Sequence, residues 1–143
     1  MEKHVYAKGK GLSEPVKVGE VLYNRGLVNA MLGVEAIRKA QEKFGKKPLT
    51  GEQVRWGLEN LNISDARLKE LGFEDMLKPI KISCSDHEGA REARVQQWDG
   101  NGWRIISDWY TANQSITEPL VNDVSAKYAA EKKIQPRDCS KES

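Results

Sequence analysis

The spacing of the apolar residues changes from the period of a helix to that of a strand near residue 80, and this change limits the folds that the chain can adopt. Up to Leu71 the apolar residues recur with the period of a helix. From Ile80 they alternate with polar residues, which is the period of a strand. The sequence therefore predicts helices first, a strand-based part second and one further helix after it.

The first half of the chain has three segments with helical periodicity. Apolar side chains of the first segment occur on more than one side, which predicts burial on more than one face. Thr50 and Gln53 have the spacing of a capping box at the start of the second. The predicted helices span residues 16–44, 50–61 and 64–71.

Gly26 interrupts the first of these helices. A glycine inside a helix costs about 1 kcal/mol relative to alanine, because its backbone loses more freedom on folding. We therefore expect the backbone of another element, or a bound solute, to approach Gly26 closely.

The second half contains a strong hairpin signal. Asp99-Gly-Asn-Gly102 supplies residues that accept a positive φ, and it separates two segments with strand periodicity. Because a two-stranded hairpin is not stable alone, the chain has the pattern of part of an α/β protein whose other strands lie elsewhere. Pro119 falls in the first turn of the final helix. The predicted strands span 80–85, 93–98 and 103–110, the final helix spans 117–132, and residues 1–15 and 134–143 are predicted to be an irregular segment and a loose tail.

Length and charge exclude several classes of function. The chain has 143 residues, a length that fits one domain. Its 23 basic and 21 acidic residues give a net charge of +2, which provides no electrostatic basis for binding nucleic acid. No apolar run reaches the length of about 20 residues that spans a membrane. Residues 1–4 also lack the apolar stretch of a signal peptide, which by itself favours the cytoplasm.

Three segments carry a resemblance to a known family. They are Val18–Ala40, Thr50–Asn60, and the polar turn Cys84–Gly89 followed by Val95–Gly100 and Trp103. In their order and spacing over residues 16–133, they resemble the C-terminal part of the periplasmic solute-binding proteins of branched-chain amino-acid ABC transporters. These proteins belong to the type I periplasmic-binding-protein family.

The resemblance implies two α/β lobes that close on a small solute, of which this chain would form about the last third. It implies a partial solute-binding component of an importer for amino acids or related small organic acids, located in the periplasm and not inserted in the membrane. Its partners would be the solute and an ABC permease, and we expect no cofactor and no enzymatic activity. As a fragment, the chain is expected to form homo-oligomers and to bind no solute tightly.

Five residues are candidates for contact with the solute on the basis of this resemblance. It places Tyr23, Asn24 and Arg25 near a hinge and cleft wall, where Arg25 could bind a carboxylate and Tyr23 could stack on a side chain. It places Asp86 and His87 at the rim of the cleft. Core packing of Tyr23 and a structural ion pair of Arg25 remain the more frequent situations for such residues.

Cys84, Asp86, His87 and Glu88 raise two further possibilities. Zinc sites usually combine two separated pairs of ligands, and the second pair is missing here, so no metal is expected. A Cys84–His87 nucleophilic pair would need an activated thiolate and an orienting group, and the sequence offers no such group.

The tryptophans of the hairpin segments could form an aromatic binding face. Trp98, Trp103 and Trp109 lie in segments with alternating polarity, and the packed side of a hairpin is the more frequent explanation of such a pattern.

The resemblance also implies a disulfide between Cys84 and Cys139, because exported proteins fold in an oxidising compartment. Closing a loop of ~55 residues would stabilise the fold by about 4 kcal/mol. Two independent thiols beside a loose tail are the alternative.

Two other functional classes stay open on the sequence alone. The first is a small self-associating structural or interaction protein without a ligand. The second, an enzyme that depends on cysteine or a metal, would require Cys84 to act as a nucleophile or ligand.

Overall fold

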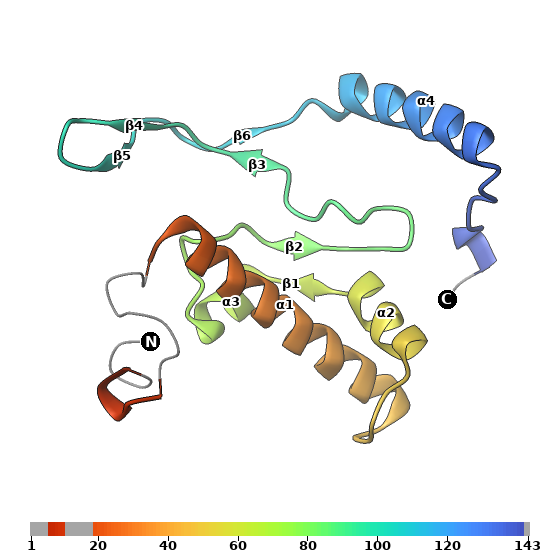
Figure 1. Cartoon of the computed structure of the whole chain (residues 1–143), viewed down its shortest axis with the longest axis horizontal. Coiled ribbons are helices and arrows are strands. Elements are labelled where there is room, and N and C mark those ends of the chain that lie inside the picture. The colour runs from red at the N-terminus through yellow and green to blue at the C-terminus, as the bar shows by residue number, and fades with distance from the viewer. Residues whose placement is uncertain (1–5, 11–18, 142–143) are drawn as a thin grey trace. The chain divides into compact units, whose positions relative to one another are not determined.

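The computed structural model of this chain describes residues 6–10 and 19–141, and it divides into two compact units, Met1–Leu61 and Asn62–Ser143 (Figure 1). Length alone had suggested one domain. Most of the predicted irregular segment 1–15, and the first residues of the predicted helix 16–44, lie outside the described residues. The fold is a mixture of helices and small sheets, and every strand pair in the described part is antiparallel.

The N-terminal unit consists of a short 3-10 helix, η1 (Tyr6–Lys8), and two α-helices, α1 (Val21–Phe44) and α2 (Gly51–Glu59). Thr50 and Gln53 form the predicted capping box. The Thr50 hydroxyl accepts from the Gln53 N–H at 3.3 Å, and the Gln53 side chain accepts from the Thr50 N–H at 3.0 Å. This prediction is confirmed.

The helices α1 and α2 approach most closely at Gly57. A Cβ atom at this position would lie 2.1 Å from the backbone oxygen of Ala36 and 3.1 Å from the Cβ of Ala40. Only glycine therefore fits here without moving one helix. At Gly26, where another element or a bound solute was expected to approach, an added Cβ would meet no described protein atom within 4 Å, so the expected approach of another element is wrong.

Three residues of α1 are buried, Met31, Ala36 and Ala40, whereas Val21 and Leu22 are 71% and 74% exposed. Because an α-helix has about 3.6 residues per turn, Met31 and Ala40 lie on opposite sides of α1. The prediction of burial on more than one face is therefore confirmed. Near the other end of the helix, the Phe44 and Trp56 rings meet edge to face with centroids 5.5 Å apart, and the Lys43 ammonium lies 4.3 Å from the Trp56 ring centroid.

The C-terminal unit begins with β1 (Asn62–Ile63), α3 (Asp65–Leu71) and β2 (Ile80–Lys81). Ile63 pairs with Ile80 across the antiparallel β1–β2 sheet, and both are buried, as is Leu68 of α3. The predicted strand 80–85 is shorter in the structure. After Lys81 the backbone turns, because Ser83 and Asp86 exchange N–H···O bonds of 2.9 and 3.2 Å.

A long antiparallel ribbon follows. It contains β3 (Glu92–Ala93), β4 (Gln96–Trp98), β5 (Trp103–Ile105) and β6 (Tyr110–Thr111), with β3 paired to β6 and β4 to β5 (Figure 1). Between the pairs Ala93–Tyr110 and Gln96–Ile105, the returning strand contains more residues than the outgoing strand. The returning strand therefore bulges. Within this bulge the Ser107 hydroxyl accepts from the Val95 N–H at 2.8 Å.

The turn between β4 and β5 forms where the Asp-Gly-Asn-Gly signal predicted it. The Asp99 carboxylate accepts from the N–H groups of Asn101 and Gly102 at 2.9 and 2.8 Å, and it also pairs with the Arg104 guanidinium. Gly100 has a φ of 98°, which a residue with a Cβ rarely adopts. These bonds lower the pKa of Asp99, first through the Asn101 N–H and then through Arg104.

The chain ends in α4 (Gln114–Lys132) and a 3-10 helix, η3 (Cys139–Lys141). The helix α4 starts at Gln114 and not at residue 117, because the Asn113 side chain caps it by accepting from the Ser115 N–H at 3.1 Å. Pro119 therefore lies beyond the first turn. No residue of α4 is buried.

Candidate functional site

A polar groove in the C-terminal unit brings several charged side chains together. Its volume is about 850 Å³. One wall comes from the loop after β2 and the other from the first turns of α4. The groove is lined by Ser85, Asp86, His87, Glu88, Ala90, Arg91, Ala112, Thr117, Glu118, Val121 and Asn122.

The loop wall is shaped by a second turn. The Asp86 carboxylate accepts from the Glu88 N–H at 3.1 Å. Gly89 follows with a φ of 75°, and a Cβ there would lie 3.3 Å from the Ile80 side chain. The chain thus folds back over β2, and this reversal brings Glu88 and Arg91 to the same side as Asp86.

Arg91 is the centre of the charged cluster in the groove. Its guanidinium lies 2.9 Å from an Asp86 oxygen and 2.8 Å from a Glu88 oxygen. With its amide oxygen turned towards Arg91, Gln114 accepts from the guanidinium at 2.6 Å and donates to Glu118 at 3.1 Å. The hydrogen bond to Glu88 raises the pKa of Arg91, and the charges of Asp86, Glu88 and Glu118 act in the same direction against partial desolvation.

This cluster links the loop to the first turns of α4. Its three carboxylates outnumber its one guanidinium, so the groove carries a net negative charge. Since Arg91 is already paired with carboxylates of its own loop, the arrangement is that of a cross-link between two chain segments. It does not resemble a clamp for an anionic ligand.

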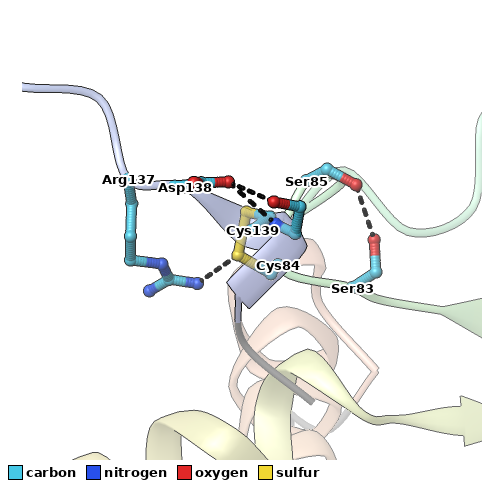
Figure 2. The surroundings of a disulfide bond; sticks show 7 residues. Ser83, Cys84, Ser85, Arg137, Asp138 and Cys139 are labelled. Atoms are coloured by element: carbon cyan, nitrogen blue, oxygen red, sulfur yellow. Dashed lines mark hydrogen bonds between the residues drawn. A yellow bond between two sulfur atoms is a disulfide. The ribbon is translucent and has the colours of Figure 1, made fainter.

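Cys84, next to the groove, forms a disulfide with Cys139, the pairing that the resemblance implied (Figure 2). The two Cα atoms lie 5.7 Å apart, within the ordinary range for a disulfide. Figure 2 shows the Arg137 guanidinium pointing at the Cys84 sulfur, with a nitrogen–sulfur distance of 2.7 Å. Because Cys84 carries no thiol in this state, it cannot act as a nucleophile beside His87.

The five candidate contact residues do not form one site within either unit. Tyr23, Asn24 and Arg25 lie in the first turns of α1, in the N-terminal unit, whereas Asp86 and His87 line the groove of the C-terminal unit. The Asn24 side chain donates to the Gly19 carbonyl at 2.9 Å, so it fixes the start of its own helix. Arg25 is exposed.

The tryptophans of the ribbon have two different environments. Trp98 and Trp103 face each other across β4 and β5 with ring centroids 5.7 Å apart, and they are 52% and 65% exposed. Trp109 lies between two cations, with Lys78 at 5.0 Å and Arg94 at 4.6 Å from its ring centroid. It also borders a second cavity, of about 280 Å³, beside α3.

Sequence reasoning missed three members of the charged cluster, namely Arg91, Gln114 and Glu118. One signal could have revealed two of them. Asn113 is a strong capping residue, and a helix that starts after it places Gln114 and Glu118 four residues apart on one face. Nothing comparable marks Arg91, because its position depends on the turn at Gly89.

The described residues contain neither a metal-binding cluster nor a membrane-spanning helix. No group of three or more His, Cys, Asp or Glu side chains in residues 6–10 and 19–141 could hold a metal ion. Across those same residues, every helix is too short or too polar to cross a bilayer.

Comparison with known proteins gives one informative match. No protein-family model matches the chain, and no curated protein does. The crystal structure of an ABC transporter permease from Pseudomonas fluorescens group is 50% identical to this chain, with a TM-score of 0.88. The match covers 96% of this chain and 34% of that chain, so this chain spans about a third of the permease's length.

This match corrects the family and function predicted from the sequence. The similar structure is that of a permease and not of a periplasmic solute-binding protein, so the resemblance to type I periplasmic binding proteins is wrong. The predicted role as the solute-binding component of an importer is wrong with it. The predicted partners are wrong for the same reason, since they were those of a free binding protein that is not inserted in the membrane. The similar structure is itself a component of an ABC transporter, and a permease is a non-enzymatic component, in agreement with the prediction that the chain is not an enzyme.

Proposed function

We propose that this chain is a segment of the permease component of an ABC transporter. The supporting observation is the match to a permease structure at 50% identity over 96% of the chain. A TM-score of 0.88 means that the two chains also share the path of the backbone over that length. The proposed role is therefore in transport, and it requires no chemical step of the segment.

We further propose that this segment lies on the oxidising side of the membrane, in the periplasm. The disulfide between Cys84 and Cys139 supports this location, since disulfides persist in oxidising compartments and are rare in the cytosol. The charged groups agree with a water-facing segment. Ion pairs such as Lys127–Asp123 and Arg67–Glu70 lie at the surface, where water solvates both partners.

Membrane fractionation in the source cells tests the assignment to a permease. An epitope-tagged protein that carries this segment is expected in the membrane fraction, and it should co-purify in mild detergent with an ATP-binding subunit. Release of the tagged protein by osmotic shock, without an ATP-binding subunit, would contradict the proposal.

Thiol labelling tests the location separately. After rapid alkylation of intact cells, Cys84 and Cys139 are expected to remain unlabelled until a reductant is added, and both should then react. The Cys84→Ser variant supplies the control, because its remaining Cys139 should label without a reductant. Labelling of both cysteines in the untreated wild type would indicate a reducing compartment.

A further inference from the structure

The C-terminal unit exposes two apolar surfaces that have no partner among the described residues. The ribbon surface consists of Trp98, Trp103, Ile105 and Tyr110, which are 48–65% exposed. The helix surface consists of the α4 residues Leu120, Val121, Val124 and Tyr128, which are 49–65% exposed. Large exposed apolar patches of this kind usually mark an interface.

Neither element is self-sufficient. Each strand pair of the ribbon is a two-stranded sheet, and such sheets are at best marginally stable in water without a covering layer. The helix α4 has 19 residues and buries none of them, although most helices gain their stability from packing one face. Both elements therefore need a covering partner that the described residues of the C-terminal unit do not supply.

We propose that the ribbon surface and the helix surface are the interface with the remaining two thirds of a longer permease polypeptide. The supporting observation is the coverage of the structural match. The permease builds the same fold over 96% of this chain, and this part accounts for 34% of its own length. The remainder of that polypeptide is thus large enough to cover both surfaces.

Charge argues against a lipid surface as the covering partner. The middle and end of α4 carry Asp123, Lys127, Glu131 and Lys132, and Glu118 lies in its second turn, so acidic groups exceed basic ones. Anionic headgroups attract basic segments and repel acidic ones. Helices that lie in a membrane interface have one strongly apolar face and one strongly charged face. The faces of α4 differ much less in polarity.

Complementation in trans tests the interface. This chain, carrying an affinity tag, is co-expressed with an untagged segment that contains the remaining two thirds of the similar Pseudomonas permease. Retention of the untagged segment on the affinity resin in a fixed ratio to the tagged chain is the expected result. The two segments are co-purified in mild detergent, and the assay needs no ATP-binding subunit, so its outcome is independent of the fractionation experiment above.

Charge substitutions locate the contact. Trp103→Glu on the ribbon and Val124→Glu on α4 should each reduce retention by about tenfold or more, because a carboxylate would be desolvated at the centre of an apolar interface. Gln97→Glu, on the opposite face of β4, and Ala126→Glu, on the side of α4 opposite Val124, are matched controls that should retain the partner as the wild type does. All four positions are exposed, so far-UV circular dichroism of each variant should match the wild type.

Three results would overturn the inference. The first is no retention by the wild type, and the second is equal retention by the Glu variants and their controls. The third is a dimer of this chain, measured by light scattering, that Trp103→Glu dissociates while co-expression leaves the dimer intact. That result would identify a second copy as the partner.

Discussion

Gly57 lies so close to the backbone of Ala36 that no side chain fits between α2 and α1. The 2.1 Å separation calculated for an added Cβ is far below van der Waals contact, and the nearest atom belongs to a backbone that cannot rotate away. Gly57→Ala should therefore push the helices apart and lower the free energy of unfolding by about 1–3 kcal/mol. Denaturant unfolding followed by far-UV circular dichroism measures the change.

Gly26→Ala is the matched control for this substitution. Gly26 is also helical, but an added methyl group meets no atom within 4 Å, so the helix propensity of alanine should stabilise the protein by up to about 1 kcal/mol. Equal destabilisation by both variants would contradict the close packing at Gly57.

Asp99 makes the β4–β5 turn sensitive to acid. Its pKa in the folded chain is lowered by the Asn101 N–H and Arg104, so the ionised form stabilises the turn above the ordinary value of 3.8. That contribution is lost as the pH falls below 3.8 and through the lowered pKa. The near-ultraviolet circular dichroism of the Trp98–Trp103 pair, recorded from pH 7 to pH 2, should show this loss in the wild type.

Asp99→Asn should remove that part of the acid transition. The amide oxygen can still accept from the two backbone N–H groups, but it carries no charge that protonation can cancel. An acid transition of unchanged position and size in this variant would show that other carboxylates control the turn. Asp108→Asn, at the ribbon's bulge, controls for a general change in net charge.

At the scale of single residues, the sequence identified local features and missed those that depend on tertiary contacts. The capping box at Thr50 was predictable, because its partner lies three residues away. Gly57 gave no signal, since its importance arises only when α1 crosses α2. The expectation that another element approaches Gly26 failed because a glycine in an exposed helix can be tolerated without any close neighbour.

The disulfide joins Cys84, in the loop after β2, to Cys139, the first residue of η3. It closes a loop with a sequence separation of 55 that contains the whole ribbon and α4. We expect the Cys84→Ser, Cys139→Ser double variant to lose about 4 kcal/mol of stability as an upper value, since the open chain gains entropy when unfolded. Thermal unfolding with and without a reductant measures this loss.

The reductant itself supplies the control. It should lower the melting temperature of the wild type to that of the double variant, and it should leave the double variant unchanged. A wild type that melts at the same temperature under both conditions would mean that the disulfide contributes nothing to stability.

The predicted elements match the structure where periodicity or turn residues mark them. The hairpin turn was located by its two glycines, and the helices α2 and α3 by their capping residues Thr50 and Ser64. The strand β1 was missed, because two residues are too few to show a period. The bulge in the ribbon was also missed, since the Ser107 hydroxyl that stabilises it gives no pattern in the sequence.

In the candidate groove, too, the sequence identified local features and missed those that depend on tertiary contacts. Asp86 and His87 were identified from their own polar segment, but Arg91 and Glu118 join them only through the turn at Gly89 and the earlier start of α4. The groove is a product of chain reversal and helix capping. Neither the volume of the groove nor its charge could be predicted from the spacing of residues in the sequence.

For the whole molecule, burial predicts a large difference in local stability. The helix α1 buries Met31, Ala36 and Ala40, whereas α4 buries no residue. Hydrogen exchange on the isolated chain should therefore show slow amides in the middle of α1 and fast amides throughout α4 and the ribbon. Exchange of α4 as slow as that of α1 would contradict the absence of stabilising contacts around it.

The wide separation of the two cysteines also sets an order of events during biosynthesis. At 5–20 residues per second, Cys139 emerges from the ribosome about 3–11 seconds after Cys84. Throughout that interval Cys84 lacks its partner Cys139, and the ribbon and α4 are made while no disulfide yet joins the segments that flank them. Oxidation can thus close the loop only after the ribbon and α4 have been synthesised. A different thiol that forms a disulfide with Cys84 first would prevent the Cys84–Cys139 bond until thiol–disulfide exchange removes it.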